Sequence, residues 1–495
     1  MKYSASLISL LLASCVATDP TAEPDVGDDE AAADTAAILA SAHVDEAIDS
    51  CDWFGMRCPE DEPIFTGPAC SSDAACGDAA CVEGHCFAGV ASPEADAILA
   101  GLTGTEVVGG NHARVVVDNA VAREIWRTLI DGGQQSINVS SLLIEDNPIG
   151  LDIAQRLAAA ARRGVEVRVM VDSYNQHDER FAILTELAEA GAKVLSFNPL
   201  RGWLGTRWDT EVSVNKRTHE KLLVVDGRIG IIGGRNIGAS YMGDARWRDS
   251  DIVVEGPAIA KMQRLLLSDW DEWSSFEVEA GCPQQRRYGL YCPAGDPPVV
   301  TEPRYYPPLA PAGTDELRII HSNPRLQDPS DGYQTYIALI RGARRSIKVT
   351  NAYFVPPYRL RRALKAAAAR GVDVTVISNS KTSNDQTFMW YAAANFFEEL
   401  ITDGVDLREW TFNTETVHAK TMIVDDQLAV IGSYNLDPRS AASNSEALAV
   451  VRGPAVADLA AAWERDLART GPVSYDFGWL EWLRIKAQRI IEPFM

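Results

Sequence analysis

The chain is 495 residues long, 46% of its residues are hydrophobic, and its formal net charge at pH 7 is -23. This length and composition permit a folded enzyme of more than one domain and exclude a chain that is disordered throughout. A strongly negative protein repels polyanions at long range, so we expect no nucleic-acid partner. Part of the excess is local, because residues 16–56 contain many carboxylates and no lysine or arginine.

The first fifteen residues have the layout of a secretory signal. Lys2 precedes an apolar stretch at 7–12, which ends in Ala13-Ser14-Cys15. The tetrad at 12–15 resembles a bacterial lipobox, which implies a lipoprotein signal peptide at 1–15 and acylation of Cys15; an ordinary signal peptide is the alternative. Because Val16 rather than aspartate follows, the resemblance favours an exported, membrane-anchored protein at the outer membrane or cell surface over one at the inner membrane.

The remaining cysteines favour disulfides. Residues 16–50 are rich in Ala, Asp, Glu and Pro, which predicts a disordered acidic tether. Residues 51–90 then form a cysteine-rich module. Apart from Cys15, the cysteines are an even set of eight: Cys51, Cys58, Cys70, Cys76, Cys81, Cys86, Cys282 and Cys292. Zinc is the competing interpretation, but export and the absence of Cys-x2-Cys pairs favour disulfides. The pairing of the first six is left open, and the last two are expected to close a loop of their own.

An internal repeat predicts two related lobes. A strand, a helix and a second strand are expected at 136–139, 153–161 and 163–169, and again at 346–349, 360–369 and 370–376. Both helices end next to a glycine, Gly164 or Gly371, which is the expected C-terminal cap. Parallel β-α-β units indicate an α/β fold, with lobes at 115–280 and 316–495 that form a pseudo-dimer. A proline-rich linker at 281–315 separates them.

Each lobe carries one copy of the same short motif. The copies are His219, Lys221 and Asp226, and His418, Lys420 and Asp425. Histidine and lysine two positions apart on a strand project from the same face. The aspartate stands where the strand turns, so we interpret it as a turn and supporting residue rather than a proton carrier.

The segment after each turn adds an asparagine. A second short strand leads to Gly234 and Asn236 in the first copy and to Ser433 and Asn435 in the second. A hairpin can bring these asparagines beside the histidine and lysine, where they would bind phosphate oxygens. Two histidines, two lysines and two asparagines supply a nucleophile, an acid, cations and donors, as the cleavage of a phosphodiester requires. We therefore expect no metal and no cofactor in this reaction.

These motifs resemble those of the phospholipase D superfamily, and the flanking sequence resembles the bacterial cardiolipin synthases that lack N-terminal transmembrane helices. The resemblance runs from about Asn119 to the C-terminus and rests on the two motifs with Gly233–Gly238, Tyr241, Asn351–Pro356, Asn379-Ser380, Gly432–Ser440 and Asn444–Glu446. It implies two phospholipase D-like lobes. It also implies that Asp249 and Glu446 orient the catalytic histidines, with Gly234 and Ser433 as supporting positions.

The leading hypothesis is a cardiolipin synthase-like phosphatidyltransferase that works through a phosphohistidine. In this hypothesis His219 attacks phosphorus and His418 protonates the leaving headgroup, and the reverse order stays open. The expected partners are a membrane surface and phosphatidylglycerol, phosphatidylethanolamine or cardiolipin as substrate. A hydrolytic phospholipase D that releases phosphatidic acid is the alternative, followed by a nuclease or other phosphodiesterase and by a non-catalytic binding lipoprotein.

Two further features of the sequence bear on these expectations. The C-terminal stretch 479–486 mixes aromatic, aliphatic and basic residues, which is typical either of an interfacial helix or of a helix packed on the core. The other histidines have no matching motif, and we expect them to be surface or structural residues: His43, His85, His112, His177 and His321.

Overall fold

The computed structural model describes residues 68–76, 79–82, 84–176, 181–198, 216–244, 247–279, 298–323, 330–412 and 415–488. The expected signal peptide, the tether and the lipid-bearing Cys15 lie outside these residues. So do Cys51, Cys58, Cys282 and Cys292, whose pairing stays a prediction.

The described part of the cysteine-rich module is a small hairpin held by two disulfides. Strands β1 (Ala80–Val82) and β2 (His85–Phe87) pair antiparallel after the short helix η1 (Asp73–Ala75). The disulfides join Cys70 to Cys81 and Cys76 to Cys86, which confirms the disulfide prediction for these four cysteines. Helix α3 (Pro93–Thr103) follows and packs against α9 (Asp331–Gly342) of the second lobe.

The predicted repeat is present in both lobes. Its elements are β4 (Ser136–Ser141), α5 (Pro148–Arg162) and β5 (Glu166–Asp172), and β13 (Ser346–Asn351), α10 (Tyr358–Ala369) and β14 (Asp373–Asn379). The two strands of each unit pair in parallel, as predicted. Gly164 and Gly371 follow the helices with φ angles of 90° and 88°, so glycine fits the left-handed position that ends each helix.

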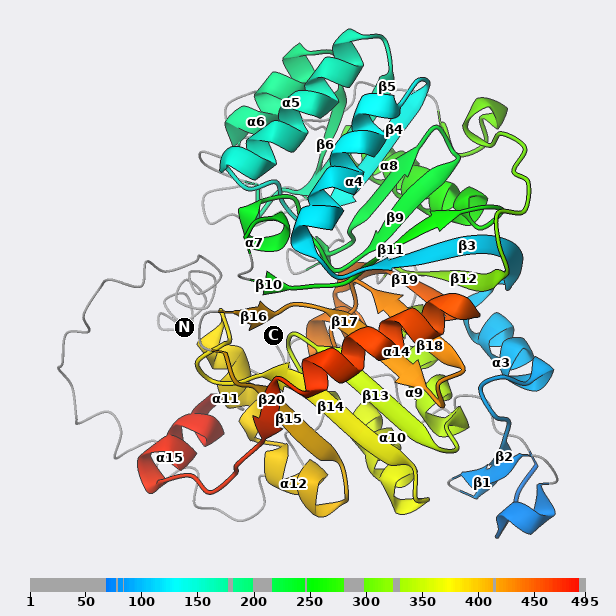
Figure 1. Cartoon of the computed structure of the whole chain (residues 1–495), viewed down its shortest axis with the longest axis vertical. Helices are drawn as coiled ribbons and strands as arrows, with labels where there is room; N and C mark the ends of the chain where they lie inside the picture. Colours follow the sequence, from blue (N-terminus) through cyan, green and yellow to red (C-terminus); the bar gives the residue numbers. More distant parts are fainter. Residues whose placement is uncertain are drawn as a thin grey trace. The chain divides into compact units, whose positions relative to one another are not determined.

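The two lobes share one continuous sheet with the same strand order on each side of its middle (Figure 1). From the middle outward, lobe 1 has β3 (Val108–Val116), β11 (Asp251–Glu255), β9 (Ile229–Gly233), β8 (Leu222–Val225), β4, β5 and β6 (Lys193–Phe197). Lobe 2 has β12 (Asp315–Ser322), β19 (Asn444–Arg452), β18 (Leu428–Gly432), β17 (Lys420–Val424), β13, β14, β15 (Asp406–Trp410) and β20 (Thr470–Pro472). The first strands of the lobes, β3 and β12, pair antiparallel and join the halves. Lobe 1 therefore begins at Val108, upstream of the expected boundary at 115.

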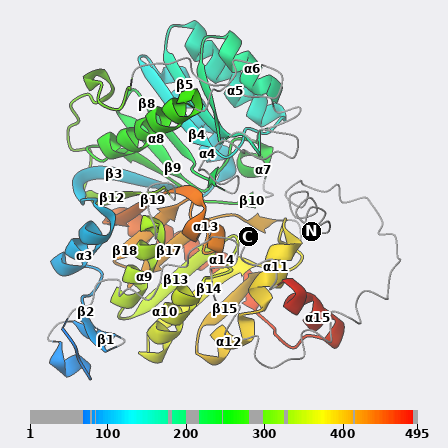
Figure 2. The same cartoon turned by 180° about the vertical axis from the view of Figure 1, so that it is seen from behind.

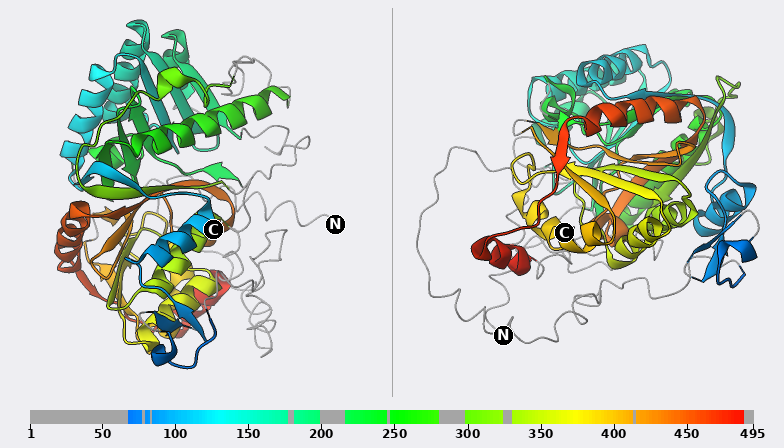
Figure 3. Two further views of the ribbon diagram at one scale, coloured as in Figure 1. Left: turned by 90° about the vertical axis from the view of Figure 1, so that its right-hand side faces the viewer. Right: turned by 60° about the horizontal axis from the view of Figure 1, so that its bottom comes forward.

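Helices cover both faces of this sheet (Figures 2 and 3). In lobe 1, α4 (Asn119–Gly132), α5 and α6 (Phe181–Glu189) cover one face and α8 (Ile259–Glu279) covers the other. In lobe 2, α9, α10, α11 (Thr387–Ala394) and α12 (Phe397–Thr402) lie opposite α14 (Pro454–Leu467). The alternation along β8 shows why both faces are covered: Leu223 and Val225 pack toward α4 and α5, whereas Leu222 and Val224 pack toward α8. The predicted α/β pseudo-dimer is confirmed.

Shorter elements complete the described chain. They are β7 (Arg217–Thr218), α7 (Ala239–Met242), β10 (Trp247–Arg248), η4 (Pro303–Tyr305), β16 (Thr416–Val417), α13 (Pro438–Ala442) and α15 (Trp479–Gln488). Among the helices of the described residues, none combines the length and the apolar character that a membrane crossing needs.

Candidate active site

Two very short strands place each motif histidine against the opposite lobe. Strand β7 pairs in parallel with β19, and the His219 N–H donates to the Ser445 carbonyl at 2.9 Å. Strand β16 pairs in parallel with β10, and the His418 N–H donates to the Arg248 carbonyl at 2.8 Å. Backbone pairing between the lobes therefore fixes both histidines at the same interface.

This crossed pairing gives each histidine a carboxylate from the other lobe. His219 Nδ1 lies 3.0 Å from both oxygens of Glu446, and His418 Nδ1 lies 2.6 Å from Asp249 Oδ2. Both carboxylates are fully buried. When Nδ1–H of a neutral imidazole donates to the carboxylate, the lone pair of Nε2 is left for a substrate. These contacts are the ones that the family resemblance implied for Asp249 and Glu446.

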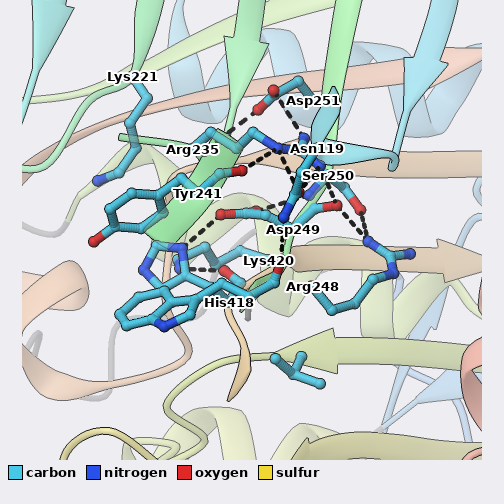
Figure 4. A network of polar contacts seen from close by, with 12 residues as sticks. Asn119, Lys221, Arg235, Tyr241, Arg248, Asp249, Ser250, Asp251, His418 and Lys420 are labelled. Carbon is cyan, nitrogen blue, oxygen red and sulfur yellow. Dashed lines mark hydrogen bonds and ion pairs between the residues drawn. The ribbon is translucent and has the colours of Figure 1, made fainter. Parts of the chain in front are cut away.

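The backbone carbonyl of Asp249 accepts from two arginines, and its carboxylate accepts from the Ser250 N–H at 2.7 Å (Figure 4). Arg235 is 1% exposed and donates to the Asp249 carbonyl at 3.0 Å and to Asp251 at 2.9 Å. Arg248 also donates to the Asp249 carbonyl and forms a bidentate pair with Asp466 of α14, at 3.0 and 2.6 Å. These contacts hold Asp249 in place from both lobes.

The carboxylate of Glu446 is held differently, by hydroxyl groups. The Ser433 and Ser440 side chains donate to it at 2.5 and 2.7 Å. The position that corresponds to Ser433 in lobe 1 is Gly234, where an added Cβ would overlap the Asp249 carboxylate. The supporting roles implied for Ser433 and Gly234 thus have a structural basis: one donates a hydrogen bond, and the other leaves room.

The two motif lysines are buried in the same centre. Lys221 is 2% and Lys420 is 0% exposed, and each Nζ donates to the carbonyl of its own motif histidine. Burial lowers the pKa of Lys221 to about 7 and that of Lys420 to about 8. Ammonium groups in a buried site favour the binding of an anion, because the anion restores the lost solvation.

Both histidines are neutral near pH 7 in the free protein. Burial lowers the pKa of His219 to about 4, against the opposing charge of Glu446, and lowers the pKa of His418 to about 3. The lysines, where they are protonated, and the two carboxylates carry opposite charges around them. A bound phosphodiester adds one negative charge, which favours protonation of one of the two imidazoles. The centre can then hold one nucleophile and one acid.

Aromatic rings from both lobes surround His418. The rings of Trp247 and Tyr241 lie 4.9 and 5.1 Å from the imidazole, and that of Tyr353 lies 6.5 Å away. Sequence reasoning used Tyr241 and Tyr353 only as parts of matched segments and did not find Trp247. Trp247 lies in β10, whose pairing with β16 is a long-range contact that local periodicity does not reveal.

The two asparagines of the motif segments have unused polar atoms. Asn236 is 0% exposed, and apart from the neighbouring Tyr241 hydroxyl its amide has no hydrogen-bond partner in the described part of the chain. The buried Oδ1 of Asn435 also has none there. Buried amides are nearly always hydrogen-bonded, so unpartnered ones beside an anion-binding centre are suited to bind a ligand.

The motif aspartates lie at the strand turns, away from the motif histidines. The Asp425 carboxylate accepts from the backbone N–H groups of Arg344, Arg345 and Ser346, and Asp226 does the same in lobe 1. Seven residues of extended strand place each aspartate about 20 Å along the chain from its histidine. Although the aspartates belong to the motif, their contacts are those of turn residues that anchor the neighbouring strand.

His321 has contacts that the sequence did not reveal. Its Nε2 lies 3.0 Å from Glu220 and 3.1 Å from Asp269, and both carboxylates are buried. Sequence reasoning missed this cluster because its members come from three distant elements. These residues are far apart in the sequence and become neighbours only in the folded chain.

Comparison with known proteins agrees with this geometry. Residues 127–270 and 336–468, more than half of the chain, match the family model described as cardiolipin synthase, PLD-like domain. The chain is 27% identical over 409 residues to the major cardiolipin synthase ClsA of Bacillus subtilis, which covers 79% of this chain and 78% of that protein. It is 29% identical over 372 residues to cardiolipin synthase 1 of Bacillus anthracis, with 74% and 68% covered.

A solved structure supports the fold as well. The crystal structure of phosphatidylserine synthase from Haemophilus influenzae superposes with a TM-score of 0.62 at 14% identity, over 82% of this chain and 100% of that one. Two matched lobes and a single centre shared between them identify the chain as a member of the cardiolipin synthase, PLD-like domain family and as an enzyme of the phospholipase D superfamily.

Proposed function

We propose that the enzyme transfers a phosphatidyl group from one phospholipid to the alcohol of another through a phosphohistidine, as a cardiolipin synthase-like reaction requires. The observation that carries this proposal is the crossed pair of neutral imidazoles, each held by a carboxylate of the other lobe, beside two buried lysines. The curated relatives named as cardiolipin synthases support the choice of lipid phosphodiesters.

The proposed reaction uses both histidines in turn. Nε2 of one imidazole attacks phosphorus, and the bond from phosphorus to the headgroup oxygen breaks. The other imidazole, protonated once the anion is bound, gives its proton to the departing alkoxide. That imidazole then takes the proton of the incoming alcohol, whose oxygen attacks phosphorus and breaks the phosphorus–nitrogen bond. Lys221 and Lys420 balance the charge on the phosphoryl oxygens, and Asn236 and Asn435 hydrogen-bond to them.

Hydrolysis is the close alternative, because water can resolve the same intermediate. The purified full chain is incubated with vesicles of phosphatidylglycerol and phosphatidylethanolamine, and the lipid products are identified by mass spectrometry. Cardiolipin with free glycerol supports the transferase, and phosphatidic acid alone supports the hydrolase. A correctly folded protein that produces neither would contradict both.

The phosphohistidine has its own test. In a single turnover that is quenched early, we expect the intact mass of the chain to rise by one phosphatidyl group. Peptide mapping should place the adduct on one histidine, with His219 as the expected position. An adduct on His418 would reverse the order of the steps, and turnover with no adduct at any time point would contradict the covalent route.

We also propose that the enzyme works at a membrane surface. Trp479, Leu480 and Trp482 on α15 are 72%, 58% and 50% exposed, whereas Ile485 is 2% exposed and packs on the core. Exposed tryptophans on an amphipathic helix are suited to the interface of a bilayer. The lipobox-like segment supports the same location, in the outer membrane or at the cell surface, through a lipid on Cys15. A Cys15→Ser protein that is still acylated and membrane-bound would contradict the anchor.

A further inference from the structure

Behind the catalytic segment of lobe 1, three ionisable side chains converge on one point. They are Glu220, which stands between His219 and Lys221, Asp269 of α8 and His321 of β12. One ligand-type atom of each lies within 4.8 Å of the other two. Glu220 and Asp269 are 0% and 1% exposed, and the His321 side chain is 22% exposed.

The period of the strand explains why Glu220 points to this place. It has the same parity as Leu222 and Val224, which pack toward α8, whereas His219 and Lys221 point to the active centre. Figure 2 shows α8 lying across this face of the lobe 1 sheet. His321 arrives from lobe 2, so the cluster spans both lobes.

The cluster adjoins the catalytic centre. On β12, His321 stands opposite Ala447 of β19, and its neighbour Ser322 stands opposite the catalytic carboxylate Glu446. A group bound to the cluster would therefore brace the segment that carries His219 and Lys221 without touching the substrate.

The cluster has fewer hydrogen-bond donors than its two carboxylates can accept from. His321 Nε2 lies 3.0 Å from Glu220 Oε1 and 3.1 Å from Asp269 Oδ2, so one ring nitrogen is shared between two carboxylates. Ser140 donates at 3.2 Å to the other oxygen of Glu220. His321 Nε2 is the nitrogen beside Asp269, and no other described residue donates to either oxygen of that carboxyl group. One nitrogen shared between two buried carboxylates compensates them poorly, so a further positively charged partner would stabilise both.

The charges point to a cation as that partner. Two carboxylates face a single imidazole, and when both carboxylates are ionised, as ligation of a metal requires, their negative charge exceeds what one imidazole can offset. The atom separations of 3.0 and 3.1 Å are close to the roughly 3.3 Å between ligand atoms around a tetrahedral zinc ion with bonds of about 2.0–2.1 Å.

We propose that Glu220, Asp269 and His321 bind one divalent transition-metal ion in a structural site, with Zn²⁺ as the ion that fits best. One imidazole nitrogen and two carboxylate oxygens are a zinc-type ligand set, whereas Ca²⁺ and Mg²⁺ take oxygen ligands in larger number. The partial exposure of His321 gives the ion a route of entry. The second motif has no counterpart of this site, because the buried Ala419 stands there at the position of Glu220. This inference does not depend on the proposed function.

The test measures metal binding and not turnover. The full chain is stripped with EDTA, dialysed and titrated with zinc chloride by calorimetry, and its melting temperature is measured with and without zinc. We expect one zinc ion per chain at micromolar affinity or tighter and a higher melting temperature, because the ion ties α8 and β12 to the catalytic segment.

Matched variants decide whether this cluster is the site. Asp269→Asn and His321→Gln should each lose the bound zinc and the thermal shift, whereas Glu409→Gln, a half-buried carboxylate of β15 bonded to Trp390, should keep both. Zinc uptake that is unchanged in both cluster variants would overturn the proposal, and so would a wild-type chain that takes up no zinc. If a cluster variant does not fold, anomalous scattering at the zinc edge from crystals of the wild-type chain settles the question, since zinc absent from this position would also overturn it.

Discussion

The two motif histidines are equivalent in geometry but not in surroundings. The carboxylate of Glu446, which holds His219, accepts from two serine hydroxyls, whereas Asp249, which holds His418, is bonded by arginines at its backbone carbonyl, and aromatic rings lie around His418 itself. Each carboxylate fixes a tautomer and would stabilise an imidazolium during the reaction.

Removing either carboxylate charge should therefore slow the reaction without unfolding the protein. For Glu446→Gln and Asp249→Asn we expect kcat to fall by about 100-fold or more, since such supporting partners contribute about that much to activity. Turnover and melting temperature are measured together. Glu409→Gln serves as the control outside the centre and should retain activity; a loss of activity in it equal to that of Glu446→Gln would contradict a specific role.

The pH profile follows from the lowered pKa values. The pKa of His219 is about 4 instead of 6.5, so its imidazole stays neutral as pH falls from 7 to 5, where a free histidine becomes protonated. Activity should therefore be lost on the acid side only as pH falls toward 4. It should decline on the alkaline side as Lys221 and Lys420 lose their protons, from about pH 7 to about 8.

The measurement for this prediction is kcat/KM against pH, which reports groups of the free enzyme. An acid limb with a midpoint near 6.5 would show that the histidines are not desolvated as the structure has them.

At the scale of elements, each hairpin is anchored by its motif aspartate. Asp425 is 3% exposed and accepts three backbone N–H groups at the start of β13. Asp425→Asn should lower the free energy of unfolding by about 2–3 kcal/mol, because hydrogen bonds to a charged acceptor are lost. The folded variant should keep a nearly normal kcat.

The neighbouring residue offers a control for this prediction. Asp426 is exposed and pairs with Lys348 at 3.0 Å, so Asp426→Asn should change stability by less than about 1 kcal/mol. Chemical denaturation of both variants makes the comparison. If Asp425→Asn abolished turnover while leaving stability unchanged, Asp425 would belong to the catalytic groups after all.

Helix α15 combines the two alternatives that its sequence left open. Ile485 packs on the core, and the tryptophans stay exposed. The double variant Trp479→Ala, Trp482→Ala should bind phospholipid vesicles roughly tenfold or more weakly, since burying a large apolar side chain contributes about 1.5–3 kcal/mol. Vesicle sedimentation measures the effect, and Tyr358→Ala, an exposed aromatic on α10, is the control. Equal binding by the wild-type chain and both variants would show that α15 does not contact the membrane.

Much of each element could be predicted from the sequence, because its signals are local. The β-α-β units follow from helical and strand periodicity with a glycine at each helix end, and the hairpins follow from Asp226-Gly227 and Asp425-Asp426. The positive φ angles of 53° at Asp226 and 57° at Asp425 are in keeping with those turns. Local signals do not predict which strands pair when they are far apart in the sequence.

At the scale of the whole molecule, the functional contacts are those long-range pairings. The antiparallel pair of β3 and β12 fuses two sheets into one, and β7 and β10 cross to the opposite lobe. These pairings bring Trp247 to His418 and His321 to Glu220. Periodicity carries no information about them, so the resemblance could imply Asp249 and Glu446 but not their exchange between lobes.

The exchange makes the two lobes dependent on each other. In an isolated lobe, the buried motif histidine would lack its carboxylate partner. In isolated lobe 1, Arg248 would also lack its ion-pair partner Asp466. Lobe 1 and lobe 2 expressed as separate chains should therefore be inactive singly. Activity of either lobe by itself, measured as lipid product at equal concentration, would contradict a shared centre.

The most direct test of the shared centre is the activity of the two histidine variants in the full chain. His219→Ala and His418→Ala are assayed singly and as a mixture on vesicles of phosphatidylglycerol, with circular dichroism to establish folding. One centre built from both lobes predicts less than about 1% of wild-type product from each variant, because the nucleophile or the acid is gone, and no recovery on mixing. If either variant retained half of the wild-type activity, the two motifs would be independent sites, and the two lobes would not share one centre.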